Sequence, residues 1–168
     1  IFQIDRIFLT HFHLDHCLDL ASILFALRIP PPGRTKPLTI YGPRGLKRLY
    51  RGLNNAVQGW LEPNGYPLRI EELGETTRRF KRYTVTTRRM HHYDTGAIGY
   101  RVEGEGKRLA YSGDTEACRA IVELGAEIPL ISHTGGSLDS AIDSYHDRFD
   151  LPDGGRTVFA RDLFRAGY

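Results

Sequence analysis

Residues 10–16 of the chain read THFHLDH. Three histidines and one aspartate fall within these seven residues, between an apolar run that ends at Leu9 and an apolar segment that follows Cys17. Imidazole and carboxylate groups are the usual protein ligands of Zn²⁺ and of similar divalent ions. A single histidine on an apolar strand is typical of a core residue, but so dense a cluster predicts a metal-binding loop.

The spacing within this segment predicts how the ligands are arranged. In an extended segment, residues two apart point to the same side, so His11 and His13 can hold one ion together. Asp15 and His16 follow where we expect a strand to end and a helix to begin. The chain bends there, which lets both side chains reach a second position. Four ligands at one strand-to-helix junction suit a centre with two metal ions.

The composition predicts one globular domain over residues 1–168, since 40% of the residues are hydrophobic and we find no linker. No apolar stretch approaches the roughly 18 residues of a membrane span, so no membrane partner is expected. Two cysteines, Cys17 and Cys118, are too few for a disulfide framework. We interpret both as core residues and predict a cytoplasmic location.

The net charge is +3, and basic residues concentrate at 44–51, 78–83 and 88–89. Such clusters attract phosphate backbones, although solvated strand and helix faces often show the same pattern.

Hydrophobic periodicity predicts alternating strands and helices. A strand is expected over residues 4–9, and a helix that begins at Asp15 and is apolar on almost every side should be buried. Prolines within 29–33 end it. The other expected elements are a strand at 37–42, a helix at 46–57, strands at 66–73 and 80–90, a hairpin at 97–114, a helix at 115–125 and a strand at 128–132. This order predicts the α/β class, or α+β in layers.

The sequence resembles the metallo-β-lactamase fold hydrolases, and within them the ribonuclease Z-like branch. The resemblance covers residues 1–127 and rests on four segments: LTHFHLDHCLDL (9–20), LTIYGPRGL (38–46), HHYDTGAIGYRVE (91–103) and LAYSGDT (109–115). It implies an αββα metallo-β-lactamase sandwich. Because the chain begins as if within a domain, we expect this sandwich to be incomplete at the N-terminus and at the C-terminus.

The resemblance also implies a role for each ligand of the loop. His11 and His13 would bind a first metal, and Asp15 and His16 a second. Asp15 would also orient the attacking water or take its proton, which makes it the expected catalytic residue.

The remaining ligands are expected from two later segments. Asp114 would bridge the two metals, although an aspartate in this setting is also a common turn and helix-capping residue. The third histidine of the first metal is His92 or His91. The family places it slightly closer to the GYR motif than either residue stands here, and we favour His92.

The implied activity is hydrolysis by a metal-activated water, and the favoured substrate is a phosphodiester. Two Zn²⁺ ions are the expected cofactors, with Mn²⁺ or Fe as alternatives. The expected partners are a small-molecule or nucleic-acid phosphodiester substrate and, as a candidate, a second copy of the chain. Ester, lactone and thioester substrates stay open, because the same fold hydrolyses them.

Two departures from the family pattern favour a different interpretation. The segment between His92 and Asp114 is one short hairpin, without the long insertion that forms a tRNA-gripping arm in ribonuclease Z. The family's C-terminal half supplies a further metal-ligand histidine on a late strand and, in ribonuclease Z, a catalytic histidine. The surroundings of His133 and His146 match neither motif. Residues 128–168 suggest a divergent or out-of-frame tail. The alternative is a non-catalytic or partially active fragment of the fold.

Overall fold

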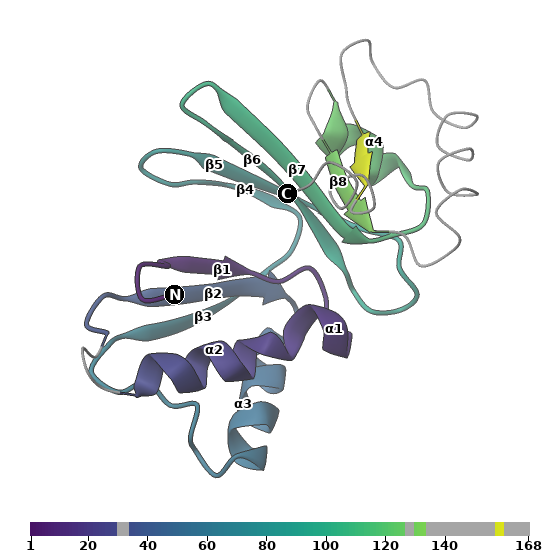
Figure 1. Cartoon of the computed structure of the whole chain (residues 1–168). Helices are drawn as coiled ribbons and strands as arrows, with labels where there is room; N and C mark the ends of the chain where they lie inside the picture. The colour runs from purple at the N-terminus through teal and green to yellow at the C-terminus, as the bar shows by residue number, and fades with distance from the viewer. Residues whose placement is uncertain (30–33, 127–129, 134–156, 160–168) are drawn as a thin grey trace. The chain divides into compact units, whose positions relative to one another are not determined.

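The computed structural model describes residues 1–29, 34–126, 130–133 and 157–159. They form two compact units, residues 1–73 and residues 74–168, which are considered separately (Figure 1). Each unit combines one β-sheet with helices, so the predicted mixed α/β class is confirmed.

The first unit is built on a parallel sheet of three strands in the order β1–β2–β3. Ile7 of β1 lies opposite Ile40 of β2, which lies opposite Ile70 of β3. Parallel neighbours require long crossovers, and the helices supply them (Figure 1). The elements are β1 (Arg6–Phe8), α1 (Leu14–Cys17), α2 (Asp19–Arg28), β2 (Leu38–Pro43), α3 (Leu46–Ala56) and β3 (Leu68–Leu73).

One face of α2 makes the core of the first unit. Leu20, Leu24 and Leu27 recur at helical spacing and pack in a cluster with Leu38 and Ile40 of β2. All five side chains are at most 2% exposed. Burying each of them contributes about 2 kcal/mol, which holds the helix against the sheet.

The opposite face of the same helix departs from the sequence prediction. The exposed apolar residues are Phe25 within α2 (43% exposed), Leu18 and Ile29 at its two caps (48% and 49%), and Leu14 in the preceding helix α1 (70%). The expectation that this helix is buried on all sides was therefore wrong for its outer face in this structure. We call these four residues the outer stripe.

The carboxylate of Glu72 caps the start of α3. Its Oε1 accepts hydrogen bonds from the backbone N–H groups of Gly45 and Lys47, both at 3.0 Å. The first turn of a helix leaves such N–H groups without partners inside the helix. The bond from Lys47, followed by that from Gly45, lowers the pKa of Glu72 below its ordinary value.

The second unit is a six-stranded sheet in the order β4–β5–β6–β7–β8–β9. Strands β4 to β7 pair antiparallel, and β7, β8 and β9 pair parallel. The elements are β4 (Thr76–Arg79), β5 (Thr84–Arg89), β6 (Ile98–Gly104), β7 (Lys107–Asp114), α4 (Arg119–Gly125), β8 (Leu130–His133) and β9 (Thr157–Phe159).

The strand predicted at residues 80–90 is wrong in its first part. Residues 80–83 are a turn that joins β4 to β5, closed by a 2.7 Å hydrogen bond from the Phe80 N–H to the Tyr83 carbonyl. The two rings stack with their centroids 4.8 Å apart. Because Thr76–Arg79 has no apolar residue, hydrophobic periodicity gave no signal for β4.

The hairpin predicted at residues 97–114 is confirmed as β6 and β7. Glu105 and Gly106 at its turn both have positive φ, +52° and +74°, as a two-residue type I′ turn requires. Helix α4 packs on this sheet so closely that a Cβ at Gly99 would lie 2.8 Å from Leu124 Cδ1. Ala110, Ile121 and Leu124 form the core of the contact.

Helix α4 begins at Arg119, four residues later than the sequence predicted. Among the described residues, no helix is both long enough and apolar enough to cross a membrane.

The Glu72→Gln substitution tests the cap on α3. Gln keeps one acceptor but loses the charge, so we expect the free energy of unfolding at neutral pH to fall by about 0.5 kcal/mol. Because the pKa of Glu72 is lowered in the folded state, its contribution is present above the ordinary value of 4.5 and is lost as the pH falls through the folded-state value. Urea unfolding at several pH values measures this. A difference that persists unchanged in acid would contradict a charged cap.

Candidate metal centre

The histidine loop leaves the sheet directly after β1. The Leu9 N–H donates to the Tyr41 carbonyl at 2.8 Å, which continues the pairing with β2 by one residue. His13 then has extended backbone angles, φ −65° and ψ 148°, and is the N-cap residue of α1. The ring of Phe12 lies against Gly45, where a Cβ would be 3.3 Å from it. The loop is thus held at both ends and in its middle.

His11 and His13 direct one ring nitrogen each at the same point. His11 Nε2 lies 3.2 Å from His13 Nδ1, and His11 is completely buried. Two imidazole nitrogens bound tetrahedrally to one Zn²⁺ would be about 3.3 Å apart. The pair therefore fits a metal ion, as its sequence spacing predicted.

Asp15 and His16 lie in the first turn of α1, beside this pair. His16 Nε2 is 3.3 Å from Asp15 Oδ2, and the His16 ring centroid is 4.3 Å from that of His11. The Asp15 side chain is 73% exposed, whereas that of His16 is 13% exposed. The structure thus brings all four loop residues together within the first unit, with one carboxylate open to solvent.

His92 and Asp114 meet in the second unit. His92 Nε2 lies 3.7 Å from Asp114 Oδ2, and both residues are 6% exposed. Asp114 ends β7, where the pairing with β8 shifts register after Tyr111 and Gly113 has a φ of +62°. A bulge of this kind redirects a side chain at the end of a strand. Each residue offers one ligand atom, so the pair also suits a metal ion.

Hydrogen bonds within the second unit hold the histidine of this pair in place. The Thr95 hydroxyl donates to the His92 carbonyl at 2.6 Å. The preceding carbonyl, that of His91, accepts from the Glu116 N–H at 2.7 Å and from the Thr115 hydroxyl at 3.3 Å. Thr115 and Glu116 therefore fasten the histidine segment, and α4 begins after them, at Arg119.

His91 points to a different partner. Its Nδ1 lies 3.3 Å from Glu116 Oε2, and both side chains are more than 60% exposed. The sequence left open whether His91 or His92 is the third histidine ligand. Of the two, His92 is the one that lies against Asp114.

Of the two C-terminal histidines, the structure describes His133 and not His146. The backbone of His133 pairs with that of Asp114 between β7 and β8. His146 lies outside the described residues, as does most of the tail at 128–168.

Burial controls the two other titratable groups near these ligands. Burial raises the pKa of the Cys17 thiol, and the Asp15 carboxylate adds to the effect. Burial likewise raises the pKa of Tyr111, with a smaller contribution from Asp114. Both groups are therefore neutral at physiological pH, and the histidines and carboxylates are the better candidates for binding a metal ion.

Sequence reasoning missed the polar residues that hold the ligands. The Thr10 hydroxyl contacts His11 Nδ1, and Thr95, Thr115 and Glu116 fasten the segment that carries His92. The only sequence signal was that each of these polar residues lies close to a candidate ligand along the chain. Thr10, Thr115 and Glu116 are within two positions of one, and Thr95 is three positions after His92. Such residues are common in turns, so the signal was weak.

Comparison with known proteins places these features in a family. A family profile described as "Beta-lactamase superfamily domain" matches residues 1–146, which extends beyond residue 127. The ribonuclease Z of Thermococcus sibiricus is 36% identical over 196 residues, covering 86% of this chain and 62% of that protein. The chain spans 31% to 62% of the length of five curated ribonuclease Z relatives that it matches.

Solved structures show the same fold. The short form of human tRNase Z aligns with a TM-score of 0.64 at 20% identity, covering 94% of this chain and 65% of that one. A metallo-β-lactamase fold protein from Bacillus subtilis aligns with a TM-score of 0.62 at 14% identity, covering 93% of this chain and 74% of that one. The resemblance expected from the four sequence segments is thereby confirmed. The chain belongs to the beta-lactamase superfamily, has the metallo-β-lactamase fold and is similar in sequence to ribonuclease Z.

Proposed function

We propose that this protein is a metal-dependent hydrolase that cleaves phosphodiesters in the manner of ribonuclease Z. The observation that carries the proposal is the contact of His11 Nε2 with His13 Nδ1 at 3.2 Å, a separation suited to two ligands of one ion. The family match and the similarity to ribonuclease Z relatives support the hydrolytic chemistry.

The proposed centre holds two Zn²⁺ ions. In this proposal His11, His13 and His92 would bind the first ion, Asp15 and His16 would bind the second, and Asp114 would be shared by both. When bound, such a pair lowers the pKa of a water molecule and stabilises the charge that develops on the attacked phosphate. This assignment keeps His91 out of the centre, since its side chain faces Glu116.

The residues of the chain then have distinct tasks. Asp15, whose carboxylate is exposed, would orient the attacking water and accept its proton. The buried His11, His92 and Asp114 hold their ligand atoms in fixed positions, because surrounding hydrogen bonds and packing leave them little freedom. Fixed ligands require little rearrangement during the reaction.

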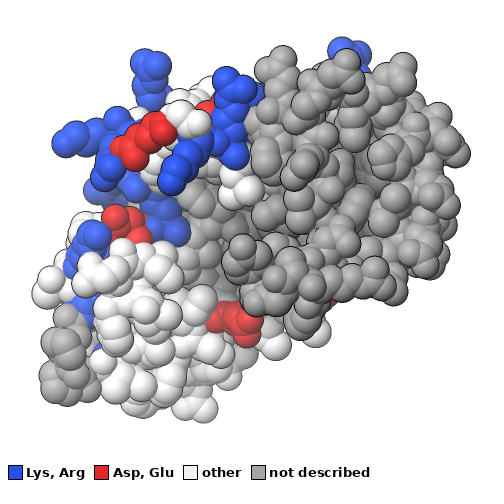
Figure 2. All heavy atoms as spheres, turned by 45° about the horizontal axis from the view of Figure 1, so that its top comes forward, with Lys and Arg blue, Asp and Glu red and all other residues white. Residues whose placement is uncertain are grey.

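A nucleic acid is the proposed substrate class. Figure 2 shows Lys and Arg side chains gathered on one face with fewer Asp and Glu. In the second unit, Lys81 and Lys107 are exposed near the ends of the two hairpins and make no ion pair with another described residue. Arg82 and Arg108 nearby are paired with Glu105 and Glu103. Exposed lysines such as Lys81 and Lys107, which have no ion pair with a described residue, attract a phosphate backbone.

The alternative is a fragment of the fold that does not turn over, or a hydrolase of another ester, lactone or thioester. The observation that favours the fragment is length, since the chain spans at most 62% of the five curated relatives.

Two thiols without a disulfide partner suit the reducing cytoplasm that we propose as the location.

Metal content and turnover distinguish these functions. We expect the purified chain to bind about two zinc ions and to hydrolyse bis-p-nitrophenyl phosphate, with all activity lost on chelation and restored by zinc. Elemental analysis and a colorimetric assay measure both. One metal ion or none, together with no turnover, would support the fragment instead.

Matched histidine variants test the assignment of ligands. His92→Ala, His11→Ala and Asp15→Ala each remove a proposed ligand, so activity should fall at least about 100-fold. His91→Ala removes only an exposed ion pair and should retain most of the activity. Circular dichroism verifies that each variant is folded. Equal losses in the two neighbouring histidine variants would contradict the assignment of His92.

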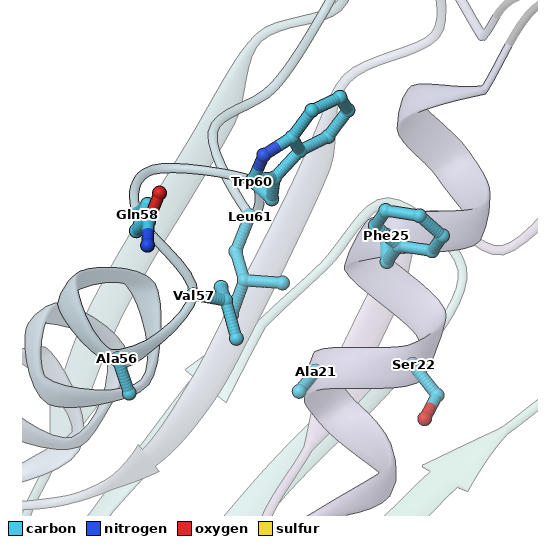
Figure 3. A pocket seen from close by; sticks show the side chains of 8 residues that line it. All are labelled: Ala21, Ser22, Phe25, Ala56, Val57, Gln58, Trp60 and Leu61. Atoms are coloured by element: carbon cyan, nitrogen blue, oxygen red, sulfur yellow. The ribbon is translucent and has the colours of Figure 1, made fainter.

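We also propose that the outer stripe mediates a homodimer. Between α2 and the end of α3 lies a groove of about 640 Å³, lined by Ala21, Ser22, Phe25, Ala56, Val57, Gln58, Trp60 and Leu61 (Figure 3). The Phe25 and Trp60 ring centroids are 6.0 Å apart, and Trp60 is 54% exposed. A protruding aromatic ring beside a groove with small residues gives one surface both the projection and the recess that a two-fold interface requires.

The size of this surface suits a second copy. The outer stripe with Val57 and Trp60 exposes roughly 500 Å² of apolar side chain, near the upper limit for monomers. A standard interface buries roughly 800 Å² of each partner, part of it polar.

Light scattering coupled to gel filtration tests this interface. The wild type should elute with the mass of a dimer, and Phe25→Asp should shift it to the monomer by placing a charge in an apolar contact. Leu109→Asp is the matched control, because Leu109 is similarly exposed, at 42%, but lies in the other unit. A wild-type monomer, or dissociation by both variants, would contradict the interface.

A further inference from the structure

We infer that Thr10 is a positioning residue that selects which nitrogen of His11 binds the metal; this inference rests on the proposed function. Thr10 and His11 are 3% and 0% exposed. The Thr10 Oγ1 lies 3.0 Å from His11 Nδ1, within hydrogen-bonding distance. Nothing in the loop pattern itself assigns this residue a role, since hydroxyl groups are not usual zinc ligands.

The two ring nitrogens of His11 have different neighbours. Nδ1 faces the threonine hydroxyl, and Nε2 faces His13 Nδ1 at 3.2 Å. A neutral imidazole has one N–H and one lone pair, and the hydrogen bond made by one nitrogen decides which one carries the proton. When the Nδ1–H of His11 donates to Thr10 Oγ1, the lone pair of Nε2 points toward His13. In this arrangement Nδ1 carries the proton and Nε2 is the nitrogen left to bind the metal, which is the tautomer that we infer Thr10 favours.

The same contact restricts the rotation of the ring. A histidine side chain has two rotatable bonds, and a hydrogen bond from Nδ1 to a buried hydroxyl holds both of them. The contact joins adjacent residues, which is geometrically awkward in a regular strand because neighbouring side chains point to opposite faces. It forms here in residues 9–13, which lie between the end of β1 and the start of α1.

Substitution of Thr10 separates the hydroxyl group from the volume of the side chain. Thr10→Val keeps the shape but removes the acceptor, and Thr10→Ser keeps the hydroxyl but loses a methyl group. We expect zinc affinity to fall about 10- to 100-fold in Thr10→Val and to remain within about 3-fold of wild type in Thr10→Ser. Competition of the apoprotein with a chromophoric chelator for zinc measures the affinity, independently of any turnover.

Thermal unfolding of the metal-free proteins is the control for a purely structural role. Thr10→Val should unfold within a few degrees of wild type when metal-free, so that its loss appears only in zinc binding. A Thr10→Val protein with wild-type zinc affinity would overturn the inference, as would a Thr10→Ser protein as weak as Thr10→Val. If the wild type bound no zinc at all, the proposed function would fail together with this role.

A second measurement does not depend on whether the variants fold. Long-range ¹H–¹⁵N correlation spectra of the zinc-loaded wild type identify which nitrogen of each histidine carries the proton. The expected pattern for His11 is a protonated Nδ1 and a zinc-bound Nε2. A zinc-bound Nδ1 in His11 would overturn the inference while leaving the proposed zinc centre intact.

Discussion

The approach of two imidazole nitrogens in the histidine loop is the constraint on which the proposed chemistry depends. His11 Nε2 and His13 Nδ1 can lie 3.2 Å apart only if the backbone between them is held firmly. The pairing of Leu9 with β2 and the packing of Phe12 on Gly45 provide that support. The parallel sheet beneath and the leucine face of α2 in turn keep β1 and β2 in register.

The second unit positions its ligands by a different device. Asp114 lies at the end of a strand whose register with β8 shifts at a bulge, and His92 lies in a segment fastened to the residues that follow Asp114. Both ligands come from irregular backbone at the end of a regular sheet. This is a common arrangement in proteins, because loops can vary in sequence while the sheet that supports them stays rigid.

Much of this organisation could be predicted because it is local. The β6–β7 hairpin, the start of α1 at the histidine loop and the leucine spacing of α2 all follow from short-range patterns. The errors have physical reasons too. β4 has no apolar residue, so only its pairing with β5 defines it. The apolar outer face of α2 looked buried because periodicity reports which side chains are apolar and not what covers them.

The sequence by itself determined the chemical nature of the site, because side-chain type and spacing alone specify which donors a short loop can offer. It also determined the family, through motifs that need no knowledge of distant contacts. Only the tertiary structure distinguishes His91 from His92, since two adjacent histidines differ solely in what surrounds them: His91 is exposed beside Glu116, and His92 is buried beside Asp114. The contact of Thr10 with His11 Nδ1 was likewise decided by the fold, because it forms in the loop between β1 and α1 and no sequence pattern specifies it.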